Sequence, residues 1–240
     1  LVAIKKTVGD KELLCVVKAN GYGHGSVQIA KSIANIKNVQ FAVFSIDEAL
    51  ALRKAKIKNK ILVFSKLQKN NIELAYKENI ILNLSSFDDI EHIETYYLKN
   101  KVSPKYHLKF DTGMTRLGFD LNDAEAIYES LSKPLHPYIE GIYTHFATAD
   151  EGDLSYAKKQ LSDFKMVVRK VESFGLKFKF IHCSNSGAVL NLEKSYFNMV
   201  RVGMLLYGAL PSNEVSDSIG IKPVMSFCGS IVNVRKVKKN

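Results

Sequence analysis

Lysines, an aspartate and a histidine close several apolar runs of this chain, at points where a buried strand would meet solvent. Lys18 closes the run LLCVVK, Lys109 and Asp111 close HLKFD, and His145 lies near the end of IEGIYTHF. A lysine in a partly apolar setting loses stabilisation of its ammonium form, and a nearby cation such as Arg116 adds to that loss. A neutral amine is a nucleophile that condenses with aldehydes. The pattern therefore predicts that Lys18 attacks a carbonyl group.

A second set of residues has the composition of an anion site. The segment SNSGAVLNL places Ser186 and Gly187 where a helix is expected to begin, so backbone N–H groups and a hydroxyl converge. Gly203 in RVGML permits close approach of the backbone, and Tyr22 is expected to add its hydroxyl. On local sequence alone, an ordinary helix cap explains the first segment equally well. An amine opposite a phosphate site indicates pyridoxal 5′-phosphate as the aldehyde, although sugar-phosphate aldolases use the same pairing.

Eight apolar segments recur along the chain and are nearly continuous in apolar residues, as strands covered on both faces should be. Helix signals lie between them. Capping boxes are predicted at Ser45 with Glu48 and at Asn122 with Glu125, and an apolar stripe runs over residues 154–171. The predicted strands are residues 13–19, 41–46, 60–66, 80–86, 105–111, 139–146, 177–185 and 199–203.

This alternation indicates an α/β fold, and eight strand–helix units are what a (β/α)8 TIM barrel requires. An open doubly wound sheet is the competitor, but no GxGxxG motif follows the first strand. Residues 1–212 are predicted to form the barrel, and residues 213–240 to begin an incomplete all-β C-terminal domain. Barrels concentrate their chemistry at the carboxyl ends of the strands. The residues named above fall at such ends, so we expect them to share one rim.

The bulk composition narrows the class of protein. With 240 residues, 46% of them hydrophobic, the chain can bury a full core. No apolar stretch approaches the roughly 20 residues that span a bilayer, and the missing initial methionine indicates part of a longer chain. Three widely separated cysteines favour reduced thiols in a cytoplasmic protein over disulfides or a metal site. The net charge of +10 comes from scattered lysines, which favours a solvated surface over nucleic-acid binding.

Five segments resemble, in order and spacing, the signature segments of bacterial alanine racemases: VVKANGYGHG, HLKFDTGMTRLGF, THFATAD, HCSNSGAVL and FNMVRVGMLLYG. The resemblance covers essentially the whole chain. It implies a pyridoxal-phosphate-dependent isomerase that interconverts L- and D-alanine and supplies D-alanine for peptidoglycan of the cell wall. It also implies a homodimer, each subunit combining a barrel with a C-terminal β domain.

The resemblance assigns roles to individual residues. Lys18 would form the Schiff base and act as the base on one face of the substrate Cα. Arg116 would reach the cofactor phenolate oxygen and the substrate carboxylate, His145 would pack beside the ring, and Arg201 would face the pyridine nitrogen. Lys109 occupies a position where many relatives carry a carbamylated lysine. The remaining expected cofactor ligands are Tyr22, Asn185, Ser186, Gly203 and Met204.

Racemisation needs a second base, which in the family is a tyrosine of the β domain, expected here beyond Asn240. The chain alone is therefore expected to racemise weakly or not at all. Three alternatives remain open on the sequence. The first is a single-barrel protein that carries pyridoxal phosphate without racemase activity. The second is a racemase for another small amino acid, such as serine, or a decarboxylase of similar architecture, and the third is a Schiff-base aldolase without cofactor.

Overall fold

The inner layer of the protein consists of strands that all pair in parallel. The structure is a computed structural model that describes residues 1–215, 217–226 and 228–238. Its two four-stranded sheets have the orders β3-β2-β1-β8 and β4-β5-β6-β7. The strands are β1 (Glu12–Val16), β2 (Val39–Val43), β3 (Ile61–Val63), β4 (Leu82–Leu84), β5 (Tyr106–Lys109), β6 (Ile139–Tyr143), β7 (Phe180–His182) and β8 (Met199–Val202).

The two sheets meet at both of their outer edges. Leu62 of β3 forms a parallel bridge with Ile81, which immediately precedes β4. At the other edge, the Arg201 N–H of β8 donates to the Ser184 carbonyl just past β7, at 2.9 Å. Strand order, parallel pairing and these two junctions are those of the predicted (β/α)8 barrel.

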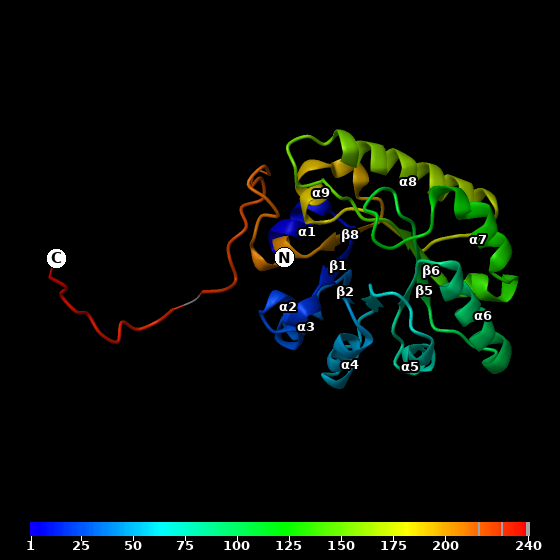
Figure 1. The fold of residues 1–240 in the computed structure, drawn as a ribbon, viewed down its shortest axis with the longest axis horizontal. Coiled ribbons are helices and arrows are strands. Elements are labelled where there is room, and N and C mark those ends of the chain that lie inside the picture. The colour runs from blue at the N-terminus through cyan, green and yellow to red at the C-terminus, as the bar shows by residue number, and fades with distance from the viewer. Residues whose placement is uncertain (216, 227, 239–240) are drawn as a thin grey trace.

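Helices lie outside the strands and follow them in chain order (Figure 1). The α-helices are α1 (Val2–Val8), α2 (Lys18–Tyr22), α3 (Ser26–Ile33), α4 (Ile46–Lys54), α5 (Ile72–Lys77), α6 (Phe87–Asn100), α7 (Ala124–Ser130), α8 (Ser155–Ser173) and α9 (Ser186–Asn191). Short 3-10 turns are η1 (Lys69–Asn71), η2 (Leu121–Asp123), η3 (Lys133–Tyr138), η4 (Glu193–Ser195) and η5 (Met204–Tyr207). The predicted apolar stripe of α8 is buried at Ala157, Leu161, Phe164, Val168 and Val171.

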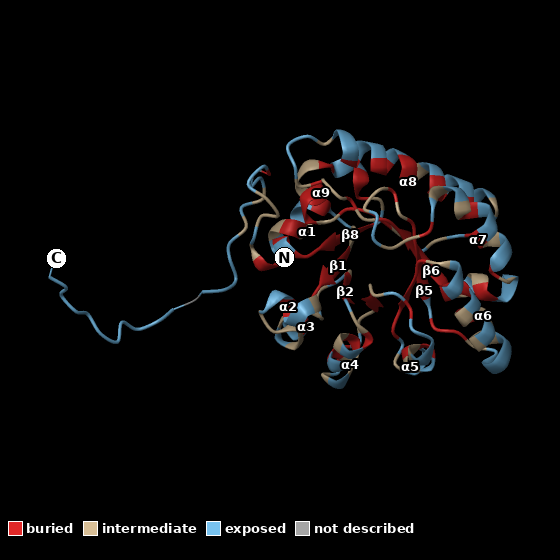
Figure 2. Ribbon diagram, viewed as in Figure 1, coloured by how far each residue is buried: buried red, intermediate tan, exposed pale blue. Residues whose placement is uncertain are grey.

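The strands pack against different partners on their two faces. In β1, Leu14 and Val16 belong to a small cluster of strand residues inside the barrel. Leu13 and Cys15 belong to the larger cluster that includes residues of the surrounding helices. Figure 2 shows the strands as the most continuously buried elements. Burial on both faces explains why the strand segments of the sequence are nearly continuous in apolar residues.

The two predicted capping boxes have different outcomes. The Ser45–Glu48 box is present at the start of α4. The Asn122 prediction is wrong, since the box ahead of α7 joins Asp120 and Asp123 and begins η2. Asp120 has extended backbone angles, and its carboxylate accepts the Asn122 N–H at 2.9 Å. Asn122 is therefore already inside the turn and cannot serve as its cap.

The segment after the barrel contains no strand among its described residues, 213–215, 217–226 and 228–238. Figure 1 shows its last part, residues 228–238, extending away from the barrel, and Ile231, Val232 and Val234 are 83%, 98% and 84% exposed. A strand needs a neighbour to satisfy its backbone groups, and these residues have none here. The assignment of 213–240 to a β domain stays a prediction, and residues 216, 227 and 239–240 lie outside the described residues.

Candidate active site

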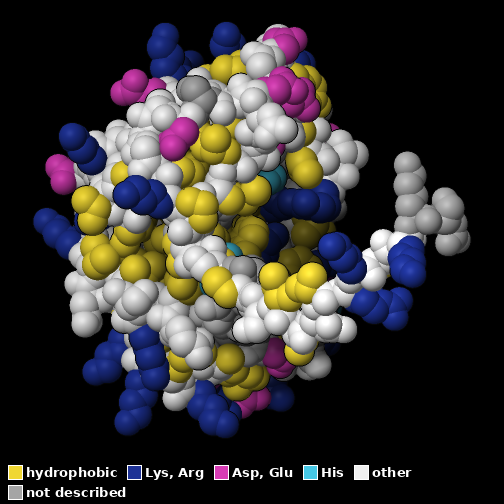
Figure 3. All heavy atoms as spheres, turned by 90° about the vertical axis from the view of Figure 1, so that its left-hand side faces the viewer, with side chains coloured by type: hydrophobic (Ala, Val, Ile, Leu, Met, Phe, Trp, Pro, Cys, Tyr) yellow, Lys and Arg dark blue, Asp and Glu magenta, His cyan; other side chains and the backbone are white. Residues whose placement is uncertain are grey.

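A cavity of about 540 Å³ lies at the carboxyl ends of the strands. Figure 3 shows a hollow in which basic and histidine side chains lie beneath a largely apolar rim. Every site residue expected from the sequence lines the cavity. These residues are Lys18, Tyr22, Lys109, Arg116, His145, Asn185, Ser186, Arg201, Gly203 and Met204.

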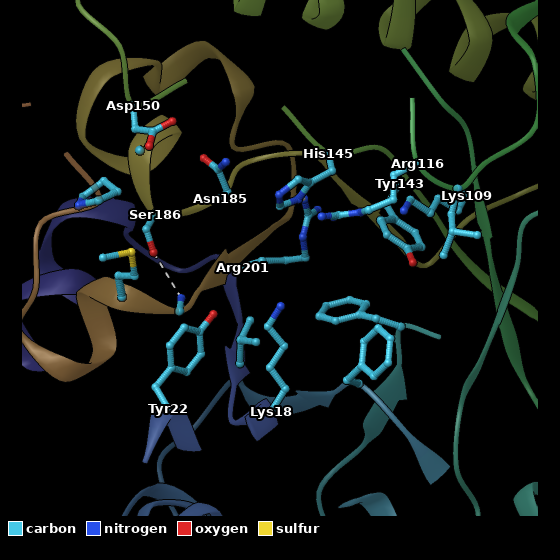
Figure 4. A pocket seen from close by; sticks show the side chains of 18 residues that line it. Lys18, Tyr22, Lys109, Arg116, Tyr143, His145, Asp150, Asn185, Ser186 and Arg201 are labelled. Carbon is cyan, nitrogen blue, oxygen red and sulfur yellow. Dashed lines mark hydrogen bonds between the residues drawn. The ribbon is translucent and has the colours of Figure 1, made fainter. Parts of the chain in front are cut away.

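Lys18 and Tyr22 enter the cavity from the two ends of one left-handed turn. Strand β1 ends at Val16 rather than at residue 19 as predicted, because residues 19–22 have φ of 51°, 51°, 63° and 53°. A left-handed backbone costs roughly 1–2 kcal/mol for each residue that carries a Cβ. Gly21 avoids that cost and the close approach of a Cβ to the Ser26 nitrogen at 3.1 Å. The turn directs the Lys18 and Tyr22 side chains into the same cavity (Figure 4).

The predicted anion site is a cradle formed where α9 and η5 begin. Asn185 caps α9 and accepts the Ala188 N–H at 3.0 Å. The Ser186 hydroxyl accepts the Gly203 N–H at 3.1 Å, and the Tyr22 hydroxyl lies so close that a Cβ on Gly203 would be 2.6 Å from it. The hydroxyls of Ser186 and Tyr22 therefore converge on the backbone of Gly203, where a residue with a Cβ would clash with Tyr22. Hydroxyl groups in this arrangement can donate hydrogen bonds to an anion.

Arg201 on β8 lines the same cavity as this cradle and is only 3% exposed. Its two Nη atoms donate to the carbonyls of Thr144 (2.8 Å), His182 (3.2 Å) and Cys183 (3.0 Å). They also contact Nδ1 of His182 and of His145, each at 3.0 Å. Burial lowers the pKa of Arg201 to about 10. The Nε–H, for which the described residues provide no acceptor, is the donor left for a ligand.

The histidines around Arg201 are held neutral and in defined tautomers. A guanidinium can only donate, so Nδ1 of His145 and of His182 must accept. His182 then carries its proton on Nε2 and donates to His107 Nδ1 at 3.0 Å, while Tyr143 stacks on its ring. Burial first, and then the charge of Arg201, hold the pKa of His145 and of His182 well below the ordinary value. His182 is thus a hydrogen-bonding support of Arg201.

Lys109 lies on the far side of the cavity from the cradle (Figure 4). It is 5% exposed, and its Nζ is 5.8 Å from the centre of the Tyr143 ring. Burial, followed by the charges of Arg116 and Arg201, lowers the pKa of Lys109 to about 8. A substantial share of this amine is therefore neutral near physiological pH, unlike that of a solvated lysine.

The sequence did not point to Phe44, Phe64, Tyr143 and Asp150, which also line the cavity. The three aromatic residues lie in apolar runs, where nothing in composition separates a site residue from a core residue. Phe44 and Phe64 each directly follow a strand, β2 and β3. A search for aromatic as well as polar residues at the ends of the predicted strands would have found both of them.

Comparison with known proteins supports the resemblance seen in the sequence. Residues 1–211 match the family model described as alanine racemase, N-terminal domain. The chain belongs to the alanine racemase family. It is 38% identical over 238 residues to the alanine racemase of Desulforamulus reducens, covering 98% of this chain and 64% of that protein.

Solved alanine racemases share the fold. The enzyme from Clostridium difficile 630 superposes with a TM-score of 0.86 at 32% identity, covering 92% of this chain and 59% of that one. The alanine racemase from Bacillus anthracis with bound L-Ala-P gives a TM-score of 0.80 at 34% identity, with 92% and 60% covered. The chain therefore spans less than two thirds of these family members.

The side-chain clusters and the helices of the protein were compared with what a metal site and a membrane span require. Within residues 1–215, 217–226 and 228–238, no group of three or more His, Cys, Asp or Glu side chains could hold a metal ion. Across the same ranges, none of the helices has both the length and the apolar character needed to cross a membrane.

Proposed function

We propose that this chain binds pyridoxal 5′-phosphate and serves alanine racemisation. The observation that carries the proposal is that the Lys18 amine, the Ser186–Gly203–Tyr22 cradle and the Arg201 guanidinium line one cavity (Figure 4). An amine, an anion cradle and a free N–H donor match the aldehyde, phosphate and pyridine nitrogen of this cofactor. Membership of the alanine racemase family supports the same reading.

The residues present fit the cofactor. Ser186, Tyr22 and the backbone at Gly203 and Met204 would hold its phosphate, beside Asn185, which fixes the start of α9. Arg201 would face the pyridine nitrogen and His145 would lie beside the ring. Bound pyridoxal phosphate supplies an electron sink that stabilises a carbanion at the substrate Cα.

The chain's own residues supply binding and proton transfer. The Lys18 amine would hold the cofactor at its aldehyde, and once released from it by the substrate amine it would accept the proton from the substrate Cα. Arg116 orients the substrate carboxylate from the mouth of the cavity. Arg201 is a cation at physiological pH, so it would disfavour protonation of the pyridine nitrogen and restrain side reactions such as transamination.

The second base is proposed to be a tyrosine outside the 240 residues, contributed by the partner subunit of a cytoplasmic homodimer. Alanine is the proposed substrate, and its product D-alanine would serve peptidoglycan synthesis. The family match supports alanine over serine, and it also favours a cofactor enzyme over a cofactor-free aldolase.

Exchange of the alanine Cα hydrogen in D2O tests this proposal on the chain loaded with pyridoxal phosphate. We expect Lys18 to exchange the α-hydrogen of one enantiomer, because a single base serves one face of Cα. Serine in place of alanine distinguishes the two racemase readings. Cofactor binding without any exchange would favour the carrier protein and contradict the proposal.

Gly203→Ala is expected to weaken pyridoxal phosphate binding about 10-fold while leaving the fold intact. The added Cβ would lie 2.6 Å from the Tyr22 hydroxyl, and the partly exposed Tyr22 would turn away from the cradle. Cofactor titration measures the effect. Gly229→Ala is the matched control, since nothing lies within 4 Å of its added Cβ. An unchanged affinity of Gly203→Ala would argue against the cradle.

Lys109 is proposed to be carbamylated and to orient Arg116. Carbamylation consumes the neutral amine, and because the pKa of Lys109 is about 8, occupancy should fall as the pH drops below that value. A carbamate signal in 13C NMR with labelled bicarbonate measures it. The signal should vanish in Lys109→Arg and persist in Lys158→Arg, which changes an exposed lysine of α8. A signal that does not depend on Lys109 would refute the assignment.

A further inference from the structure

Glu48 joins α4 to the turn that carries Lys18. One carboxylate oxygen, Oε1, accepts the Ala19 N–H at 2.6 Å, and the other, Oε2, accepts the Phe44 N–H at 2.7 Å. Oε2 also receives the Ser45 N–H at 3.4 Å, which completes the capping box. The capping box alone would use only the Ser45 contact. The two shorter bonds go instead to the residue that follows Lys18 and to an aromatic residue of the cavity wall.

The conformation of this turn requires contacts from other elements. Residues 19–22 all have positive φ, a conformation that persists only where surrounding structure fixes it. Inside the turn, the Gly21 N–H donates to Val17 and the Gly23 N–H to Ala19. The Ala19 N–H, in contrast, is bonded to Glu48, a residue of a different element. Glu48 therefore holds the turn at its first residue, directly beside the Lys18 backbone.

The turn is also braced at its other end. Tyr207 donates its hydroxyl to the Val16 carbonyl at 3.0 Å, and its ring packs against Tyr22 and stacks on His24. These contacts fix the strand and the ring of Tyr22. Ala19 lies along the chain between strand β1 and Tyr22. Its position therefore influences the distance from the Lys18 amine to the Tyr22 hydroxyl.

We propose that Glu48 is a positioning residue that fixes the left-handed turn, and with it the spacing of Lys18 and Tyr22. The ligand in this inference, pyridoxal phosphate, rests on the proposed function, whereas the Glu48 contacts do not. Lys18 and Tyr22 would engage the aldehyde and the phosphate, which are attached to neighbouring carbons of one ring. An error in the turn would therefore weaken both contacts together. The same carboxylate would set the position of Phe44 on the cavity wall.

Glu48→Gln is the sharpest variant, because a carboxylate accepts at both oxygens while a glutamine accepts at only one. Either Ala19 or Phe44 would then face an NH2 group and lose its acceptor. We expect amide hydrogen exchange over residues 19–23 to accelerate about 10-fold in the chain without cofactor. We also expect the affinity for pyridoxal phosphate to fall about 10-fold, measured by absorbance and by the borohydride-trapped fraction.

Two controls separate positioning from simple destabilisation. Asp47→Asn removes an equal charge from the same first turn of α4 at an exposed residue and should change neither readout. Ser45→Ala removes the side-chain cap on the Glu48 N–H, so it should lower the melting temperature yet leave cofactor affinity unchanged.

Glu48→Gln with wild-type exchange over residues 19–23 and wild-type cofactor affinity would overturn the inference while leaving the proposed function intact. Faster exchange in Glu48→Gln would support the role of Glu48 in fixing the turn even if the unmodified chain binds no pyridoxal phosphate. Absence of cofactor binding by the unmodified chain would refute the proposed function. A loss of affinity equal to that of Ser45→Ala would reduce Glu48 to a helix cap and also overturn the inference.

Discussion

Lys18→Ala is expected to abolish covalent attachment of pyridoxal phosphate and to reduce Cα hydrogen exchange of alanine by a factor of about 1000 or more. Lys18 is the amine that the left-handed turn directs into the cavity beside Arg201 and the phosphate cradle (Figure 4). Without it, the aldehyde has no partner and the substrate Cα has no base on that face. The visible absorbance of the loaded chain and deuterium incorporation measure the two losses.

The control for this variant is Lys158→Ala, which removes an exposed lysine of α8 that does not line the cavity. Lys18→Arg keeps the positive charge but cannot form a C=N bond with an aldehyde, so it should fail as completely as the alanine variant. Covalent attachment that survives in Lys18→Ala would show that another amine binds the aldehyde.

Arg201→Met is expected to lower the free energy of unfolding by about 3 kcal/mol. The substitution leaves the carbonyls of Thr144, His182 and Cys183 and two histidine nitrogens without their donor. Relief of the buried charge acts in the opposite direction, but several orphaned acceptors outweigh it, since each costs about 1 kcal/mol or more. Urea unfolding measures the change.

The same variant has a second expected effect, on pKa. The Arg201 charge helps to lower the pKa of His145 and of His182, so its removal should raise both values in an NMR titration. Arg169→Met, at an exposed position of α8, should change neither stability nor these titrations. Wild-type stability in Arg201→Met would mean that the hydrogen bonds of the guanidinium contribute nothing net.

The sequence predicts most of the barrel because its signals are local and repeated. Strands buried on both faces leave continuous apolar runs, and the polar residue that ends each run marks the rim. Lys18, Lys109 and His145 were found in this way, and all of them line one cavity. Their convergence follows from topology, since parallel strands of a barrel end on the same side.

Other features escape such reasoning for physical reasons. The left-handed turn after Lys18 depends on a long-range bond from Glu48, which no local propensity encodes. His107 and Tyr143 support Arg201 from within apolar runs, where they look like core residues. The β-rich segment after Pro211 has strand propensity but no neighbouring strand, and its described residues form none.

The most direct test of the account is borohydride reduction of the chain loaded with pyridoxal phosphate, followed by peptide mapping by mass spectrometry. We expect one pyridoxyl label on the peptide containing Lys18, formed with loss of the visible absorbance. Label on another lysine, or no label in a folded chain at saturating cofactor, would contradict it.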